Sequence, residues 1–149
     1  MDDQNDRRHF EDLTVGERVD LGGETLTEAG IVAFAERWDP LAFHVDPAAA
    51  ERSHGGLIAS GYHTLCLTAR LAVESFRSEV AAIAGLGIDS LSWARPVRPG
   101  GRLEGRLEGI GERPSGRRPD ARGFREAVAG RVDGERGGRH EDAGPGGRR

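Results

Sequence analysis

Residues 55–78, GGLIASGYHTLCLTARLAVESFRS, contain the strongest structural signal in the chain. The first charged residue in this stretch is Arg70, so a helix over residues 57–78 is apolar nearly all round, and such helices are usually buried. The sequence therefore predicts a long central helix that begins at or just after Gly56. Gly61 inside it costs about 1 kcal/mol relative to alanine, which indicates close packing there. We expect the least accessible residues to include Leu57, Ile58, Leu65, Leu67 and Leu71.

A strand and a shorter helix are predicted before this stretch. Residues 17–25 have the pattern of a strand that contains two glycines. Thr27 is a suitable N-cap for a helix. Four apolar residues then recur at the spacing of one helix face: Ile31, Phe34, Ala35 and Trp38. Pro40 ends this helix, because the residue before a proline is disfavoured in the helical region. We expect a loop over 39–46 and a short helix over 47–52.

After the apolar stretch, the periodicity changes from that of helices to that of strands. Residues 86–94 are predicted to form a strand with an irregularity, such as a bulge. Residues 102–108 alternate between charged residues and leucine or glycine, as in a half-exposed strand. This order of elements is typical of an α+β fold in which a helix packs against a mostly antiparallel sheet.

Apolar residues are unevenly distributed over the 149 residues, a length that suits one domain. Residues 111–149 contain ten Gly and ten Arg, and their Leu, Ile, Val and Phe residues are limited to Phe124, Val128 and Val132. We therefore expect a flexible start over 1–9, a folded domain over 10–110, and a low-complexity tail over 111–149. The tail is predicted to be mobile or weakly helical, because it has too little apolar surface to offset its ordering entropy.

The charge distribution and the cysteine count exclude several classes of protein. Residues 1–110 carry 18 acidic residues and 11 arginines, which argues against a nucleic-acid partner. The single cysteine, Cys66, excludes an intrachain disulfide and a cysteine-based zinc site. The sequence has neither a visible secretory signal nor a membrane span. We therefore expect a cytoplasmic protein without a membrane partner.

Asp39 and His44 are the best candidates for catalytic residues. They lie five positions apart on one predicted loop, between Trp38 and Phe43. A carboxylate and an imidazole in an apolar setting can together hold and deprotonate a water molecule. The alternative is that Asp39 caps the helix end and His44 is a packed loop residue.

Gly56 is a second candidate, because it directly precedes the predicted central helix. The first turn of a helix has unpaired N–H groups, and a glycine there lets a ligand oxygen approach them. Gly56 could thus contribute to an oxyanion hole, or it could serve only as a flexible connection. His54, His63 and Cys66 are weaker candidates, and no metal-ligand spacing stands out.

Three stretches together resemble the MaoC-like dehydratases, the (R)-specific enoyl-CoA hydratase group of hot-dog folds. They are FAERWDPLAFHVDPAAA (34–50), GGLIASGYHTLCLTARL (55–71) and GLGIDSLSWARPVRPGGRL (85–103). The resemblance covers residues 10–110, with a faint continuation over 113–123. It implies a hot-dog fold, in which an antiparallel sheet wraps around a long central helix.

The resemblance also implies roles for individual residues. Asp39 and His44 match the residues that activate water in that family. Gly56 matches the glycine that supplies the oxyanion-hole N–H, and Thr64 matches a hydroxyl residue that supports the catalytic aspartate. Leu41 departs from the family pattern, in which an asparagine is usual two positions after the aspartate.

The activity implied is the reversible hydration of a 2-enoyl-CoA to a 3-hydroxyacyl-CoA. The resemblance also implies that the substrate is an acyl-CoA or an acyl carrier protein thioester, that the protein forms a homodimer, and that no metal or other cofactor is needed. Two alternatives stay open, namely another hot-dog activity such as an acyl-CoA thioesterase, or a non-catalytic remnant. The remnant is suggested by the tail, because family members have two further apolar strands after residue 110. A frameshifted or degenerate gene end would account for this difference.

Overall fold

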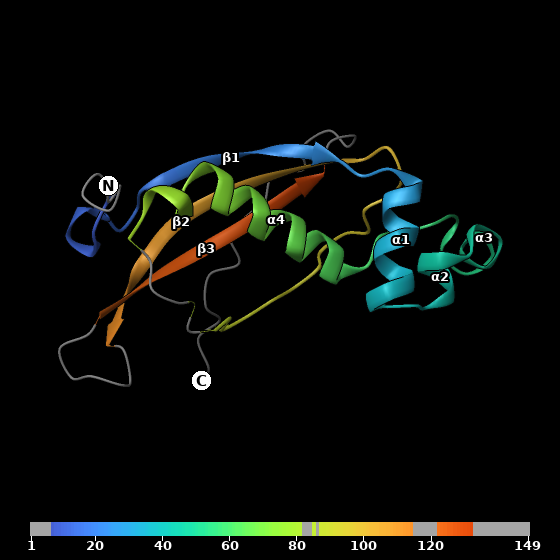
Figure 1. Cartoon of the computed structure of the whole chain (residues 1–149). Coiled ribbons are helices and arrows are strands. Elements are labelled where there is room, and N and C mark those ends of the chain that lie inside the picture. The colour runs from blue at the N-terminus through green and yellow to red at the C-terminus, as the bar shows by residue number, and fades with distance from the viewer. Residues whose placement is uncertain (1–6, 82–84, 86, 115–121, 133–149) are drawn as a thin grey trace, which may run out of the picture.

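The computed structural model of the chain describes residues 7–81, 85, 87–114 and 122–132 (Figure 1). It contains, in order, η1 (Phe10–Asp12), β1 (Arg18–Thr25), α1 (Glu28–Trp38), α2 (Ala42–Val45), α3 (Pro47–His54), α4 (Gly61–Ser75), η2 (Arg77–Glu79), β2 (Arg102–Pro114) and β3 (Arg122–Val132). The prediction of α1 is confirmed, because the Thr27 side chain accepts a hydrogen bond from the Gly30 N–H and the helix ends before Pro40.

The three strands form one antiparallel sheet in the order β1-β2-β3. Leu107 in the middle strand pairs with Val19 on one side and with Val128 on the other. The two glycines in β1 lie at an irregularity between Asp20 and Gly23. Gly22 adopts a φ of 71° there, and its N–H donates to the Asp20 carboxylate at 2.9 Å. A glycine suits this position because side chains are disfavoured at positive φ.

Helix α4 lies across the sheet and closes the first of two apolar clusters (Figure 1). That cluster joins α4 to β1 and β2 through Leu21, Leu71, Ala72, Phe76 and Leu107. The second cluster joins the N-terminal half of α4 to α1, α3 and the segments around residues 57–59 and 97–103. It contains Leu26, Ile31, Ala50, Leu57, Ala59, Leu67, Val97 and Leu103. The predicted α+β arrangement of a sheet against a long helix is confirmed.

The predicted start of the central helix is wrong. Helix α4 begins at Gly61, and Ser60 is its N-cap. The preceding residues are extended instead, because the Ala59 N–H donates to the Val97 carbonyl at 2.8 Å. Leu57 is still buried, so an apolar run that reads as the first turn of a helix is here an extended segment of the core.

The burial of α4 is also less complete than expected. Leu67 and Leu71 are buried as predicted, whereas Ile58 and Leu65 are only half-buried. One face of the helix is open, with Tyr62, Cys66 and Val73 exposed. On α1, Ile31 and Ala35 face the core, but Trp38 is 63% exposed, contrary to the predicted apolar face.

Two predictions for shorter segments are corrected by the structure. Residues 87–101 form no strand, although a strand was predicted over 86–94. The segment 39–46 is not entirely a loop, because it contains the single turn α2. The helix predicted over 47–52 is present as α3, where the Asp46 side chain accepts from the Ala48 and Ala49 N–H groups.

Ordered contacts extend across the expected domain boundaries at residues 9 and 110. Strand β2 continues to Pro114, and residues 122–132 form β3 instead of a mobile or weakly helical tail. Backbone pairing along a neighbouring strand needs few large side chains, so a composition poor in leucine does not exclude it. At the other end, the Arg8 N–H donates to the Glu79 carbonyl at 2.8 Å, which ties the N-terminal segment to η2. The rest of the predicted tail, residues 133–149, lies outside the described residues, as do residues 1–6.

Candidate active site

Asp39 owes its position to the end of α1. It is the C-cap residue of that helix, and its N–H donates to the Ala35 carbonyl at 2.9 Å. Pro40 prevents the helix from continuing, so the chain turns and the carboxylate is directed back toward the start of α4. The side chain is 20% exposed, which leaves it accessible to a ligand.

His44 lies on α2 and is buried, with 5% of its surface exposed. Its Nδ1 lies 2.7 Å from the Ile58 carbonyl oxygen. A carbonyl only accepts hydrogen bonds, so Nδ1 carries the hydrogen and Nε2 is the bare nitrogen of the neutral ring. The ring also packs edge-on against Phe43, with 4.4 Å between the ring centroids. These two contacts fix the orientation of the imidazole.

The structure brings Asp39 and His44 together, as expected from their spacing. His44 Nε2 lies 3.4 Å from Asp39 Oδ2. The hydroxyl of Ser60 donates to the same oxygen at 2.7 Å. Within the described residues, Oδ1 of Asp39 has no hydrogen-bond partner. The pair therefore offers two groups that can accept a proton, Oδ1 and Nε2, next to a fixed carboxylate oxygen.

Ser60 is a site residue that the sequence analysis missed. It is completely buried, and its Oγ also accepts a hydrogen bond from the Tyr62 N–H at 3.1 Å. The available signal was the preference of serine for helix N-caps. The prediction that the helix starts near Gly56 concealed this signal, because it placed Ser60 within the helix.

Gly56 does not lie where the sequence analysis placed it. It follows the end of α3, and its N–H donates to the Ala50 carbonyl at 3.3 Å. The expectation that it opens the central helix is therefore wrong. Gly61 is the first residue of α4 instead, and the N–H of a first helical residue has no acceptor within the helix.

Thr64 lies one turn into α4, and among the described residues its hydroxyl does not donate to Asp39. Its hydroxyl donates to the Gly61 carbonyl at 2.8 Å. The support for the Asp39 carboxylate that the resemblance implied for Thr64 is instead provided by Ser60. Thr64 nevertheless lines the pocket beside the Asp39–His44 pair.

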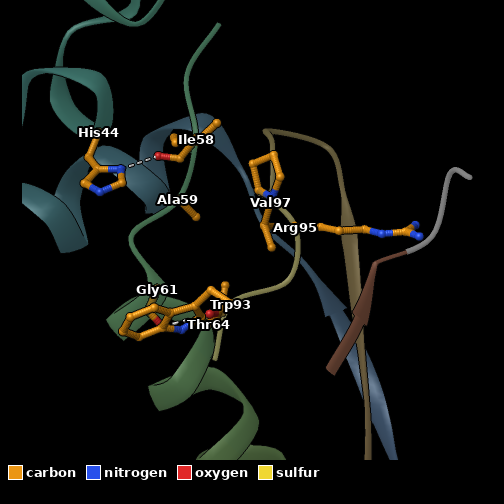
Figure 2. Close-up of a pocket in the computed structure, with 9 residues that line it drawn as sticks. His44, Ile58, Ala59, Gly61, Thr64, Trp93, Arg95 and Val97 are labelled. Atoms are coloured by element: carbon orange, nitrogen blue, oxygen red, sulfur yellow. Dashed lines mark hydrogen bonds between the residues drawn. The ribbon is translucent and has the colours of Figure 1, made fainter. Parts of the chain in front are cut away.

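A pocket of about 230 Å³ opens next to His44 and the start of α4 (Figure 2). Most of its lining is apolar, apart from the imidazole, the Thr64 hydroxyl and one arginine. The lining residues are His44, Ile58, Ala59, Gly61, Thr64, Trp93, Arg95, Pro96 and Val97. An apolar pocket with a few convergent polar groups is the usual form of a small-molecule site.

His63 points away from this arrangement toward α1. Its ring stacks on Phe34 at a centroid distance of 4.5 Å, and burial lowers the pKa of the imidazole. Its Nδ1 is buried without a hydrogen-bond partner among the described residues. The other two weaker candidates, His54 and Cys66, are both exposed.

Neither a metal site nor a membrane-spanning helix is found in the described part of the chain. No group of three His, Cys, Asp or Glu residues within it could hold a metal ion. None of its helices combines the length and the apolar character needed to cross a membrane.

Comparison with solved structures confirms the hot-dog fold. The chain superimposes on the MaoC-like dehydratase from Rhodospirillum rubrum with a TM-score of 0.75 and 39% identity, covering 83% of this chain and 85% of that one. It also superimposes on the (R)-hydratase from A. caviae involved in PHA biosynthesis, with a TM-score of 0.55 and 25% identity. That match covers 80% of this chain and 94% of the (R)-hydratase.

Sequence comparison identifies the family. The chain is 36% identical to Protein MaoC of Klebsiella aerogenes over 103 residues, which is 68% of this chain but only 30% of that protein. It is 39% identical to Nodulation protein N of Rhizobium meliloti over 89 residues, covering 56% of this chain and 55% of that protein. The profile of the MaoC-like domain matches residues 11–124. The chain therefore belongs to the MaoC-like domain family.

Proposed function

We propose that the chain catalyses the reversible hydration of a 2-enoyl thioester to a 3-hydroxyacyl thioester. The observation that carries this proposal is the Asp39–His44 pair, held by Ser60 at the start of α4 and adjoining an apolar pocket. The pair can hold a water molecule, the pocket can hold an acyl chain, and the helix N-terminus can hold a carbonyl oxygen.

The proposed reaction begins with a water molecule bound between Asp39 Oδ1 and His44 Nε2. One of these two groups takes a proton from the water as its oxygen forms a bond to C3 of the enoyl group. The electrons of the C2–C3 double bond move toward the thioester carbonyl, and a proton is then delivered to C2 from the pair. Dehydration is the same sequence in reverse.

The negative charge that develops on the thioester oxygen needs stabilisation. We propose that the Gly61 N–H donates to this oxygen, in the role that the resemblance assigned to Gly56. The N-terminal end of α4 favours a negative charge at the same place. The resulting enzyme uses an acyl-CoA or an acyl carrier protein thioester as substrate, requires no resident cofactor, and acts as a homodimer.

A hydration assay on the purified chain tests the proposal. Loss of the enoyl absorbance of crotonyl-CoA, with formation of 3-hydroxybutanoyl-CoA, is the expected result. Asp39→Asn and His44→Ala are each expected to abolish this activity without unfolding the protein. Asp46→Asn is the control for the first variant, because asparagine also caps a helix. His54→Ala is the control for the second.

Three outcomes contradict the proposal. The first is comparable activity in the parent protein and in either Asp39→Asn or His44→Ala. The second is release of free thiol from a saturated acyl-CoA without hydration of crotonyl-CoA, which indicates a thioesterase. The third is a folded protein with neither activity, which indicates a non-catalytic binding protein.

A further inference from the structure

The Gly61 amide, the proposed donor to the thioester oxygen, lies where a helix holds its backbone least. Its N–H belongs to the first residue of α4, so it has no acceptor within the helix. Glycine also has more backbone freedom than other residue types. The Ser60 hydroxyl, which caps the helix, accepts from the Tyr62 N–H and not from Gly61. A contact from outside the first turn is therefore needed to fix the direction of the Gly61 N–H.

Trp93 supplies such a contact from a distant part of the sequence. Its indole Nε1–H donates to the Gly61 carbonyl oxygen at 3.0 Å, across 32 positions. The ring also fills the space that a side chain at Gly61 would need, because an added Cβ atom would overlap with it. Figure 2 shows the indole against this first turn of α4. Gly61 is thus restrained by a hydrogen bond and by packing at once.

The segment that carries Trp93 is also attached to the residues just before α4. The Ala59 N–H donates to the carbonyl of the buried residue Val97 at 2.8 Å. Residues 59–61 are therefore held to residues 93–97 at two points, one on each side of Ser60. The Ser60 hydroxyl in turn donates to the Asp39 carboxylate. The placement of the Gly61 amide relative to Asp39 thus depends on the bond from Trp93.

We propose that Trp93 is a positioning residue that directs the Gly61 N–H toward the thioester oxygen. This inference rests on the proposed hydratase function and adds a residue that acts through Gly61 and not on the substrate. Negative charge grows on the thioester oxygen as water adds to C3, so a misdirected donor weakens the transition state more than it weakens substrate binding. Loss of the bond from Trp93 therefore lowers kcat and leaves KM nearly unchanged.

Trp93→Phe tests the inference, because phenylalanine keeps an aromatic ring beside Gly61 but has no N–H to donate. With crotonyl-CoA we expect kcat to fall roughly tenfold and KM to stay within about twofold, a smaller loss than the roughly 100–1,000-fold that removal of an oxyanion donor itself costs. The pH profile should not change, because Asp39 and His44 are untouched. Trp38→Phe is the matched control, because Trp38 is the other tryptophan, is 63% exposed and does not line the pocket. It should keep the parent values of kcat and KM.

The Thr64 hydroxyl provides a second test, because it donates to the same Gly61 carbonyl at 2.8 Å. Thr64→Val removes this hydroxyl and keeps the shape of the side chain. Together with Trp93→Phe it leaves the carbonyl with neither of these two donors, so the double variant should have a lower kcat than either single variant. Thr68→Val is the control, because the Thr68 hydroxyl makes a similar bond to the Thr64 carbonyl one turn further along α4. Added to Trp93→Phe, it should not lower kcat further.

An NMR titration separates failure of this inference from failure of the proposed function. Butanoyl-CoA has the thioester carbonyl but no double bond to hydrate, and the amide proton of Gly61 reports on a hydrogen bond to that carbonyl. We expect this resonance to move downfield in the isotope-labelled parent protein and clearly less in Trp93→Phe. Such a difference supports the inference even if the parent protein hydrates no enoyl-CoA and the proposed function fails.

Three results overturn the inference. The first is an equal shift of the Gly61 amide proton in the parent protein and in folded Trp93→Phe. The second is the absence of any shift of this proton in the parent protein. The third is a Trp93→Phe protein that hydrates crotonyl-CoA with the kcat of the parent protein.

Discussion

The hydroxyl of Ser60 donates a hydrogen bond of 2.7 Å to Asp39 Oδ2, across 21 positions of sequence. Ser60 is the N-cap of α4 and Asp39 is the C-cap of α1, so this bond joins the C-terminal end of α1 to the N-terminal end of α4. A serine hydroxyl has only one hydrogen to donate, and here it goes to Asp39 while the oxygen accepts from Tyr62. The orientation of the carboxylate is therefore coupled to the start of α4.

Replacement of Ser60 by alanine tests this coupling. We expect Ser60→Ala to lower kcat by up to about a hundredfold, because the carboxylate loses the bond that positions it. The loss of the N-cap is expected to lower the free energy of unfolding by about 0.5–2 kcal/mol. Thr27→Ala removes the N-cap of α1 instead, so it should reduce stability without a comparable loss of kcat. Ser60→Thr keeps a hydroxyl and should retain most of the activity. Equal kcat values in Ser60→Ala and Thr27→Ala would rule out a role of Ser60 in positioning the Asp39 carboxylate.

The contact between Gly61 and Trp93 predicts strong coupling in a double-mutant cycle. Gly61→Ala places a methyl group against the indole and should cost about 1–3 kcal/mol of stability. Trp93→Ala removes the obstacle, so Gly61→Ala should cost much less in that background. The cycle is measured by urea unfolding, with Gly30→Ala as the control substitution, since Gly30 contacts Thr27 and not Trp93. Additive effects of Gly61→Ala and Trp93→Ala would disprove the contact.

The ion pair between Arg8 and Glu17 predicts that the N-terminal segment stabilises the fold. Both carboxylate oxygens of Glu17 accept from Arg8, at 2.6 and 2.7 Å, and this contact lowers the pKa of Glu17. Arg8→Ala should reduce stability by about 1 kcal/mol or less, because both side chains are partly exposed. The contribution is complete above the unfolded pKa of a glutamate and is lost as the pH falls through the lower folded value. Thermal melts of Arg8→Ala and the exposed control Arg7→Ala test this, and equal Tm values would contradict it.

Local signals in the sequence explain which parts of the fold were predictable. Thr27 and Pro40 mark both ends of α1, and Asp39 and His44 are close enough in sequence that one loop brings them together. The start of α4 was not predictable, because Leu57 fits a buried helix as well as a buried extended segment. What decides between them is the hydrogen bond from Ala59 to Val97, a residue distant in sequence.

Strand β3 was missed for a related reason. Phe124, Val128 and Val132 are four residues apart, and this spacing fits one face of a helix as well as one face of a strand. The pairing with β2 selects the strand. The role of Gly61 was only half predicted: its need for close packing is confirmed by Trp93, but its place at the start of α4 depended on the position of Ser60.

The last prediction concerns His63, whose pKa is lowered from its ordinary value of 6.5 by burial. Above that value the residue is neutral in both the folded and the unfolded chain, so it has no effect on the pH dependence of stability. As the pH falls below 6.5, the unfolded chain takes up the proton more readily than the folded one, and the free energy of unfolding decreases.

His63→Phe keeps a ring to stack on Phe34, removes the unpartnered Nδ1 and removes this proton uptake. We therefore expect it to reduce the drop in Tm between about pH 7.5 and about pH 5.5. His54→Phe, which replaces an exposed histidine, should leave that drop unchanged. If the two variants show the same drop as the parent protein, His63 is not the source of acid sensitivity, and its ring must be able to accept a proton in the folded chain as easily as in the unfolded one.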